Sequence, residues 1–90
     1  MEGVKHQTLH NDAKGRIVEF TFAPGAKLRA HSSPLAASAY VARGVAFFQM
    51  GNAEEERLAA GRFVEIPPGA VHSVRADANS EMVLVLTVWK

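Results

Sequence analysis

The stretch EIPPGAVH, residues 65 to 72, decides how we interpret the fold. Pro67 and Pro68 have no backbone N–H to donate, so two prolines in succession end a β-strand. Gly69 supplies a turn, because glycine adopts positive φ without steric cost. His72 then lies near the start of the alternating run VHSVRA. The stretch therefore predicts the end of one strand, a tight turn, and a new strand that carries a histidine.

Similar strand patterns, separated by turn signals, occupy the rest of the chain. In RIVEFTF, residues 16–22, Val18, Phe20 and Phe22 share one face, which is typical of a half-buried strand. Gly51-Asn52 predicts a two-residue hairpin turn into a returning strand at 53–61. About nine short strands and no helix predict an all-β sandwich or barrel. The expected segments are residues 4–9, 16–22, 35–44, 45–50, 53–61, 62–66, 71–76 and 81–89, with a further short strand around His31.

Composition places the chain among ordinary globular proteins, with 48% apolar and 21% charged residues. Residues 1–90 are expected to form one domain. The formal charge of +1, without a basic run, predicts no nucleic-acid partner and no membrane partner. The absence of cysteine excludes disulfides and thiolate chemistry. Residues 1–10 lack the apolar core of a signal peptide, and no stretch is long enough to span a membrane, so we expect a cytoplasmic protein.

The last expected strand is apolar on both faces. Met82 to Leu86 and Val88 to Trp89 lack the alternation of a strand that faces water on one side. Because large apolar patches are uncommon on the surfaces of monomers, a second subunit is expected to cover this strand. The alternative is that a loop or the N-terminal strand covers it. The pattern favours a homodimer.

Two histidines lie at regular distances from glycines. Gly25 is followed after five residues by His31, and Gly61 is followed after five residues by Pro67, then Gly69 and His72. This spacing resembles the two motifs of the cupin family, in small single-domain form. The first motif reads glycine, five residues, His, one residue, His, three or four residues, Glu, six residues, glycine. The second reads glycine, five residues, Pro, one residue, Gly, two residues, His, three residues, Asn.

The resemblance covers about residues 20–89 and implies a double-stranded β-helix, the cupin jelly-roll barrel, often dimeric. It also implies that His31 and His72 stand at metal-ligand positions. The other two ligand positions depart from the pattern, because they hold Ser33 and Ala37, and Ala76 stands at the closing Asn position of the second motif. The metal-binding motif is therefore degenerate.

The remaining donors predict a pocket instead of a strong metal centre. Residues 31 and 33, two apart on a strand, are expected to face the same way. We therefore take His31, Ser33, Ala37 and His72 as the ligand pocket. Without an anionic ligand, a buried divalent cation keeps its full charge at high cost. No dedicated cofactor is expected, and a weakly bound divalent metal on His31 and His72 is the alternative.

Two carboxylates and two further histidines are candidates for additional metal ligands. Glu19 and Glu65 are the carboxylates nearest to the expected pocket strands, and their alternation with apolar neighbours favours a solvent-facing or interface position. The sequence leaves open which face of residues 62–66 lines the pocket. His6 and His10 are expected on one face of the N-terminal strand, exposed or hydrogen-bonded.

Three functions are compatible with these residues. The first is a non-catalytic module, with a vestigial site, that binds a small organic ligand through serine and neutral imidazole. The second is a metal-dependent enzyme of the dioxygenase or isomerase type, whose two-histidine site the substrate completes. The third is a structural or regulatory dimer without ligand, whose cavity is filled by Phe47, Phe48 and Met50. No catalytic residue can be assigned.

Overall fold

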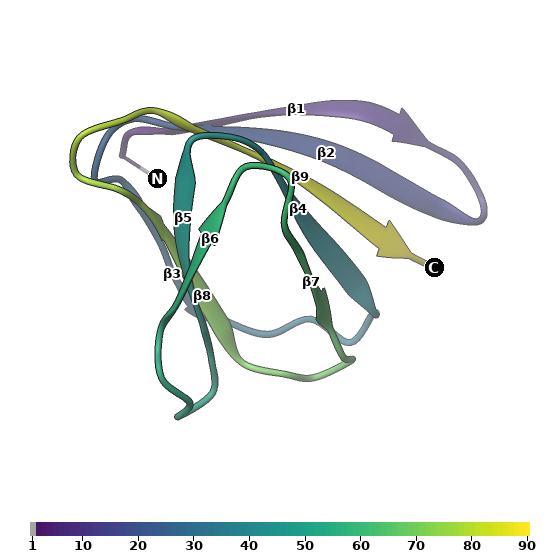
Figure 1. The fold of residues 1–90 in the computed structure, drawn as a ribbon. Coiled ribbons are helices and arrows are strands. Elements are labelled where there is room, and N and C mark those ends of the chain that lie inside the picture. Colours follow the sequence, from purple (N-terminus) through teal and green to yellow (C-terminus); the bar gives the residue numbers. More distant parts are fainter. Residues whose placement is uncertain (1) are drawn as a thin grey trace.

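The computed structural model describes residues 2–90, which form nine β-strands in two antiparallel sheets (Figure 1). In these residues no helix has the length and apolarity needed to cross a membrane. The strands are β1 (Val4–Asn11), β2 (Gly15–Phe22), β3 (Lys27–His31), β4 (Ala37–Arg43), β5 (Val45–Met50), β6 (Glu56–Ala59), β7 (Phe63–Ile66), β8 (His72–Ala76) and β9 (Met82–Trp89).

The strand order is that of a jelly roll. One sheet has the order β1-β2-β9-β4-β7 and the other β3-β8-β5-β6, so the chain crosses repeatedly between the layers after β2. Figure 1 shows β1, β2 and β9 in one layer, and β3, β5, β6 and β8 in the other. The predicted all-β jelly-roll fold is confirmed. The two sheets share no strand, so the described strands do not close a hydrogen-bonded barrel.

The core lies between the inner faces of the two sheets. Alternation along β2 buries Val18 and Phe22, as the sequence pattern predicts. Phe22, Val41 and Met82 are the largest fully buried side chains. Burying an apolar side chain of this size contributes about 1.5–3 kcal/mol each. This packing holds the sheets face to face and leaves β3 as a free edge.

The turn between β5 and β6 differs from the prediction. It spans residues 51–55, and the returning strand begins at Glu56, opposite Phe48. Contacts outside the hairpin account for the longer loop. The Gly51 N–H donates to the Val71 carbonyl at 2.7 Å, and Arg75 on β8 binds the Glu55 carboxylate at 2.9 and 3.1 Å. The Arg75 guanidinium also lowers the pKa of the Glu55 carboxyl.

The N-terminal strand also differs in one respect. Thr8 lies opposite Val18 and His10 lies opposite Ile17, so one extra residue interrupts β1 between Thr8 and His10. A β-bulge of this kind reverses the facing of every residue beyond it. His6 and His10 therefore lie on opposite faces of β1, and the prediction of a shared face was wrong. His10 forms a hydrogen bond from Nε2 to Asp12 at 2.8 Å.

Alanine substitutions at two glycines with positive φ test how closely the β4–β5 connection approaches the start of β9. Gly44 has φ of 80°, and a Cβ there would overlap the Glu81 carbonyl oxygen; Gly61 has φ of 93° and no atom within 4 Å of such a Cβ. Both alanine variants carry the cost of about 1–2 kcal/mol for a left-handed conformation. We expect Gly44→Ala to lower the free energy of unfolding in urea by clearly more than Gly61→Ala. Equal losses would contradict the close approach of β4–β5 to β9.

Candidate functional site

The two motif histidines meet across one strand pair. β3 and β8 are antiparallel neighbours, and His31 lies directly opposite His72. Their ring centroids are 4.3 Å apart, with an angle of 59° between the ring planes. Residues that are 41 positions apart in the sequence, 31 against 72, thus form one side-chain pair.

An irregularity in β3 makes this pairing possible. Leu28 lies opposite Val74 and His31 lies opposite His72, so three steps along β3 match two steps along β8. In a regular strand, residues three apart face opposite sides. The extra residue, in the segment Arg29–Ala30, lets both Leu28 and His31 face the space between the sheets.

Backbone carbonyl groups orient both rings. Nδ1 of His31 lies 2.9 Å from the Arg29 carbonyl oxygen, and Nδ1 of His72 lies 2.9 Å from the Ala70 carbonyl oxygen. A carbonyl oxygen only accepts, so Nδ1 must carry the hydrogen and donate it in each ring. In the neutral rings, Nε2 then keeps its lone pair. The pair offers two acceptors, or two ligand nitrogens.

The two rings border a small, mostly apolar cavity of about 40 Å³ between the sheets. His72 is buried, with 8% of its surface exposed, and its ring stacks on Phe48 at a centroid distance of 5.9 Å. A volume of this order accommodates about three water molecules, since one water needs about 10–15 Å³ of such space, or a short apolar group. The cavity is lined by Phe20, Leu28, His31, Ala39, Phe48, Ile66, His72, Val74, Leu84 and Leu86.

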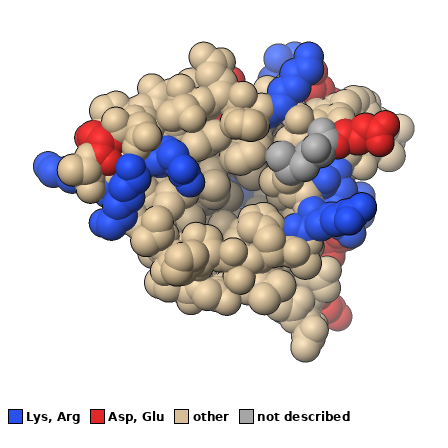
Figure 2. All heavy atoms as spheres, turned by 180° about the vertical axis from the view of Figure 1, so that it is seen from behind, with Lys and Arg blue, Asp and Glu red and all other residues tan. Residues whose placement is uncertain are grey.

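A larger groove of about 760 Å³ lies outside this cavity, along β3. The two spaces share Phe20, Leu28 and His31, so the groove and the cavity adjoin at these side chains. The remaining groove residues are Glu2, Lys27, Arg29 and Ala30. Figure 2 shows a hollowed face with Lys and Arg side chains beside it.

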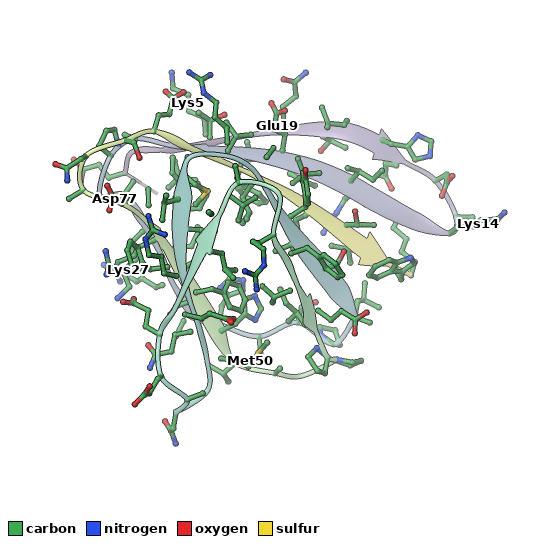
Figure 3. All side chains as sticks on the ribbon, viewed as in Figure 1. Lys5, Lys14, Glu19, Lys27, Met50 and Asp77 are labelled. Atoms are coloured by element: carbon green, nitrogen blue, oxygen red, sulfur yellow. The ribbon has the colours of Figure 1, made fainter. Side chains whose placement is uncertain are left out.

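Sequence reasoning did not identify the groove residues before His31. Lys27 and Arg29 belong to the run KLRAH, whose alternation around Leu28 is a signal that could have indicated their position. Figure 3 shows Lys27 at the side of the molecule where β3 lies, far from Lys14 at the tip of the β1–β2 hairpin.

Ser33 and Ala37 lie outside the cavity lining. β3 ends at His31, so Ser33 is in the following loop, where its carbonyl accepts from Gly69 N–H at 2.7 Å and its Oγ accepts from Leu35 N–H at 3.3 Å. Ala37 is buried at the start of β4, between Ile66 and Val88. The structure brings together the two histidines of the predicted pocket and places the other two residues apart from the cavity.

The candidate carboxylates also face away from the cavity. The sequence left open which face of residues 62–66 lines the pocket. Val64 and Ile66 face inward on β7, and Glu65 is exposed beside Phe63. Glu19 projects from the outer face of β2 (Figure 3). Within residues 2–90, no three His, Asp or Glu side chains are grouped to hold a metal ion. Two neutral imidazoles alone do not fit a tightly held divalent metal.

Comparisons with known proteins agree with this geometry. Residues 18–89 match the protein family described as Cupin domain. A cupin-like protein from Thermotoga maritima is 30% identical, with a TM-score of 0.88 over 94% of this chain and 67% of that protein. An RmlC-like cupin from Shewanella frigidimarina is 23% identical over 97% of this chain and 76% of that one, also with a TM-score of 0.88.

KdgF from a Halomonas species has the same fold, at 20% identity and a TM-score of 0.88, over 100% of this chain and 83% of that one. No protein with curated function matches the sequence. The likenesses under 25% identity show the fold alone.

The ring hydrogen bonds predict the tautomers of His31 and His72. In long-range ¹H–¹⁵N spectra at a pH where the rings are neutral, both should show a protonated Nδ1 and an unprotonated Nε2, since each Nδ1 donates to a carbonyl oxygen. His6, whose ring packs beside Phe20, serves as the internal comparison. A protonated Nε2 on a neutral His31 or His72 would contradict the described ring orientation.

Proposed function

The chain belongs to the cupin family, and we propose that it is a non-catalytic module that binds a small organic molecule. One observation carries this proposal: the His31–His72 pair borders an apolar cavity that adjoins a larger groove. Ligand pockets generally combine apolar walls with a few oriented polar groups.

The imidazole pair supports hydrogen-bond recognition. With Nδ1 used by the backbone, each Nε2 accepts a hydrogen bond from a hydroxyl or N–H group of the ligand, or from a water molecule held beside the ligand. The cavity is too small for a whole metabolite, so the bulk of the ligand lies in the groove and only a small group enters between the sheets. Because neutral imidazole is cheaper to desolvate than a charged group, this recognition has a low cost.

The alternative is a metal-dependent enzyme of the cupin type. The Nδ1-to-carbonyl bonds favour this candidate, because the same bonds orient imidazoles in many metal sites. Such a metal would need further donors, which could come from water and from a carboxylate of the substrate. This candidate therefore predicts firm metal binding only when substrate is present.

The third candidate, a dimer without ligand, requires the cavity to be filled by side chains. Phe48 lines the cavity, whereas Phe47 packs under Arg75. The Cζ atom of the Arg75 guanidinium lies 4.1 Å from the centroid of the Phe47 ring. Phe47 therefore does not fill the cavity. This arrangement favours a binding module over a filled core.

Melting curves separate the three candidates. For untagged protein, we expect no change in melting temperature with EDTA and a rise of several degrees with at least one compound of a metabolite library, since a ligand at 100 times its Kd adds about 2.7 kcal/mol. His31→Ala should abolish the rise, because His31 borders both cavity and groove. His10→Ala, at the end of β1 and outside both spaces, is the matched control.

Other outcomes contradict the proposal. Stoichiometric metal after purification, together with a lower melting temperature in EDTA, would establish the metal-dependent alternative. The absence of any stabilising compound would favour the dimer without ligand.

We also propose that a second copy of the chain covers the outer face of the five-stranded sheet. Tyr40, Phe63 and Trp89 on this face are 45%, 62% and 50% exposed. Tyr40 lies opposite both Phe63 and Val85, so apolar side chains form a continuous row across three strands. Sheet-on-sheet packing by a two-fold copy would bury this row.

Light scattering after size-exclusion chromatography tests the dimer. The wild-type chain should give twice its mass of 9.7 kDa, and Phe63→Glu should give a monomer, because a charge in the interface has no partner. Val71→Glu is the control, since Val71 is 49% exposed but lies in the loop before β8. A wild-type mass of one chain would refute the dimer.

A further inference from the structure

We infer that the groove along β3 selects a small, singly charged carboxylate with a short apolar tail. The inference rests on the proposed function, because it names the ligand class for the same site. It follows from three features: an uncommitted guanidinium, the balance of charges in the groove, and the size of the adjoining cavity.

Arg29 supplies the anion-binding group. Arg29 is one of the residues that line the groove, and it forms neither of the ion pairs among residues 2–90. Arg75, on the neighbouring strand, differs because Glu55 already binds its guanidinium at 2.9 and 3.1 Å. Guanidinium groups bind carboxylates through two parallel, charge-assisted hydrogen bonds. A carboxylate in the groove would give Arg29 the partner that Glu55 gives Arg75.

The other charges of the groove indicate a single negative charge on the ligand. Among the described residues that line the groove, Lys27 and Arg29 are cations and Glu2 is an anion, which leaves one positive charge in excess when His31 is neutral. A monoanion matches this balance, whereas a dianion would leave an excess negative charge beside the Glu2 carboxylate.

The cavity determines the other end of the ligand. Phe20 and Leu28 border both spaces, so an apolar tail that extends from the groove along these side chains would point toward the histidine pair. The charged head must remain in the groove, because burial of an unpaired charge among apolar side chains is costly. The cavity volume of about 40 Å³ corresponds to about three water molecules, so the inserted part is a short tail of two or so carbons, with room for a water molecule that donates to the histidine Nε2 atoms.

Propionate and propionamide test the charge requirement, because they have nearly the same shape. Each is titrated into the folded protein while the methyl resonances of Leu28 and Leu86, two cavity residues, are followed by NMR. We expect propionate to shift both and propionamide to bind at least tenfold more weakly. Arg29→Gln should weaken propionate binding about tenfold, since a hydrogen bond to a charged group contributes at least about 1.4 kcal/mol.

Arg57→Gln is the matched control. Arg57 is also exposed on an edge strand of the same sheet, but on β6 at the opposite edge, and it lines neither space. This variant changes the net charge equally and should bind propionate like wild type.

The outcomes separate this inference from the proposed function. The inference is overturned, while the cavity remains a binding site, if propionamide binds as tightly as propionate. The same holds if the Arg29→Gln variant binds propionate as tightly as the wild type. If propionate leaves both leucines unshifted but a neutral library compound stabilises the protein, the inference is likewise overturned. If Arg29→Gln and Arg57→Gln weaken propionate binding equally, the effect comes from the net charge of the protein, and the inference is also overturned.

Discussion

The antiparallel pairing of β3 with β8, with one extra residue in β3, is the constraint on which the site depends. It places His31 opposite His72 and keeps Leu28 on the same inner side. Without the extra residue, the alternation of the strand would turn either Leu28 or His31 outward. One local irregularity therefore determines both the imidazole pair and the position of the Leu28 side chain beside it. β3 is an edge strand, which is where such bulges are common.

The site has an organisation that does not need a metal ion to hold its side chains. Backbone carbonyl groups orient the two rings through Nδ1, and Phe48 stacks on His72. The polar groups at the cavity are the two imidazoles, while the charged groups lie in the outer groove. In the function that we propose, the cavity limits the size of the ligand and the groove selects its charge.

The fold was predictable because its signals are local. The Pro-Pro-Gly turn before His72 depends on the backbone properties of proline and glycine. The alternation of apolar and polar residues along β2 is likewise visible within the strand itself. The bulges in β1 and β3 have no local signal, because an extra residue is visible only against the partner strand. For this reason the facing of His10 differed from simple alternation, whereas Ser33 lies outside the cavity because β3 ends at His31. The β5–β6 loop was mispredicted for a similar reason, since Arg75 and Val71 hold it from another strand and loop.

The most direct test of this account is the nuclear Overhauser effect between the ring protons of His31 and His72 in the ligand-free protein. Ring centroids 4.3 Å apart bring ring protons close enough for a strong effect, and a second effect should connect His72 to Phe48. Observation of both would establish that the extra residue of β3 turns His31 inward beside its partner. A signal between His72 and Phe48 without any between the two histidines would show that His31 faces solvent, and would contradict the account.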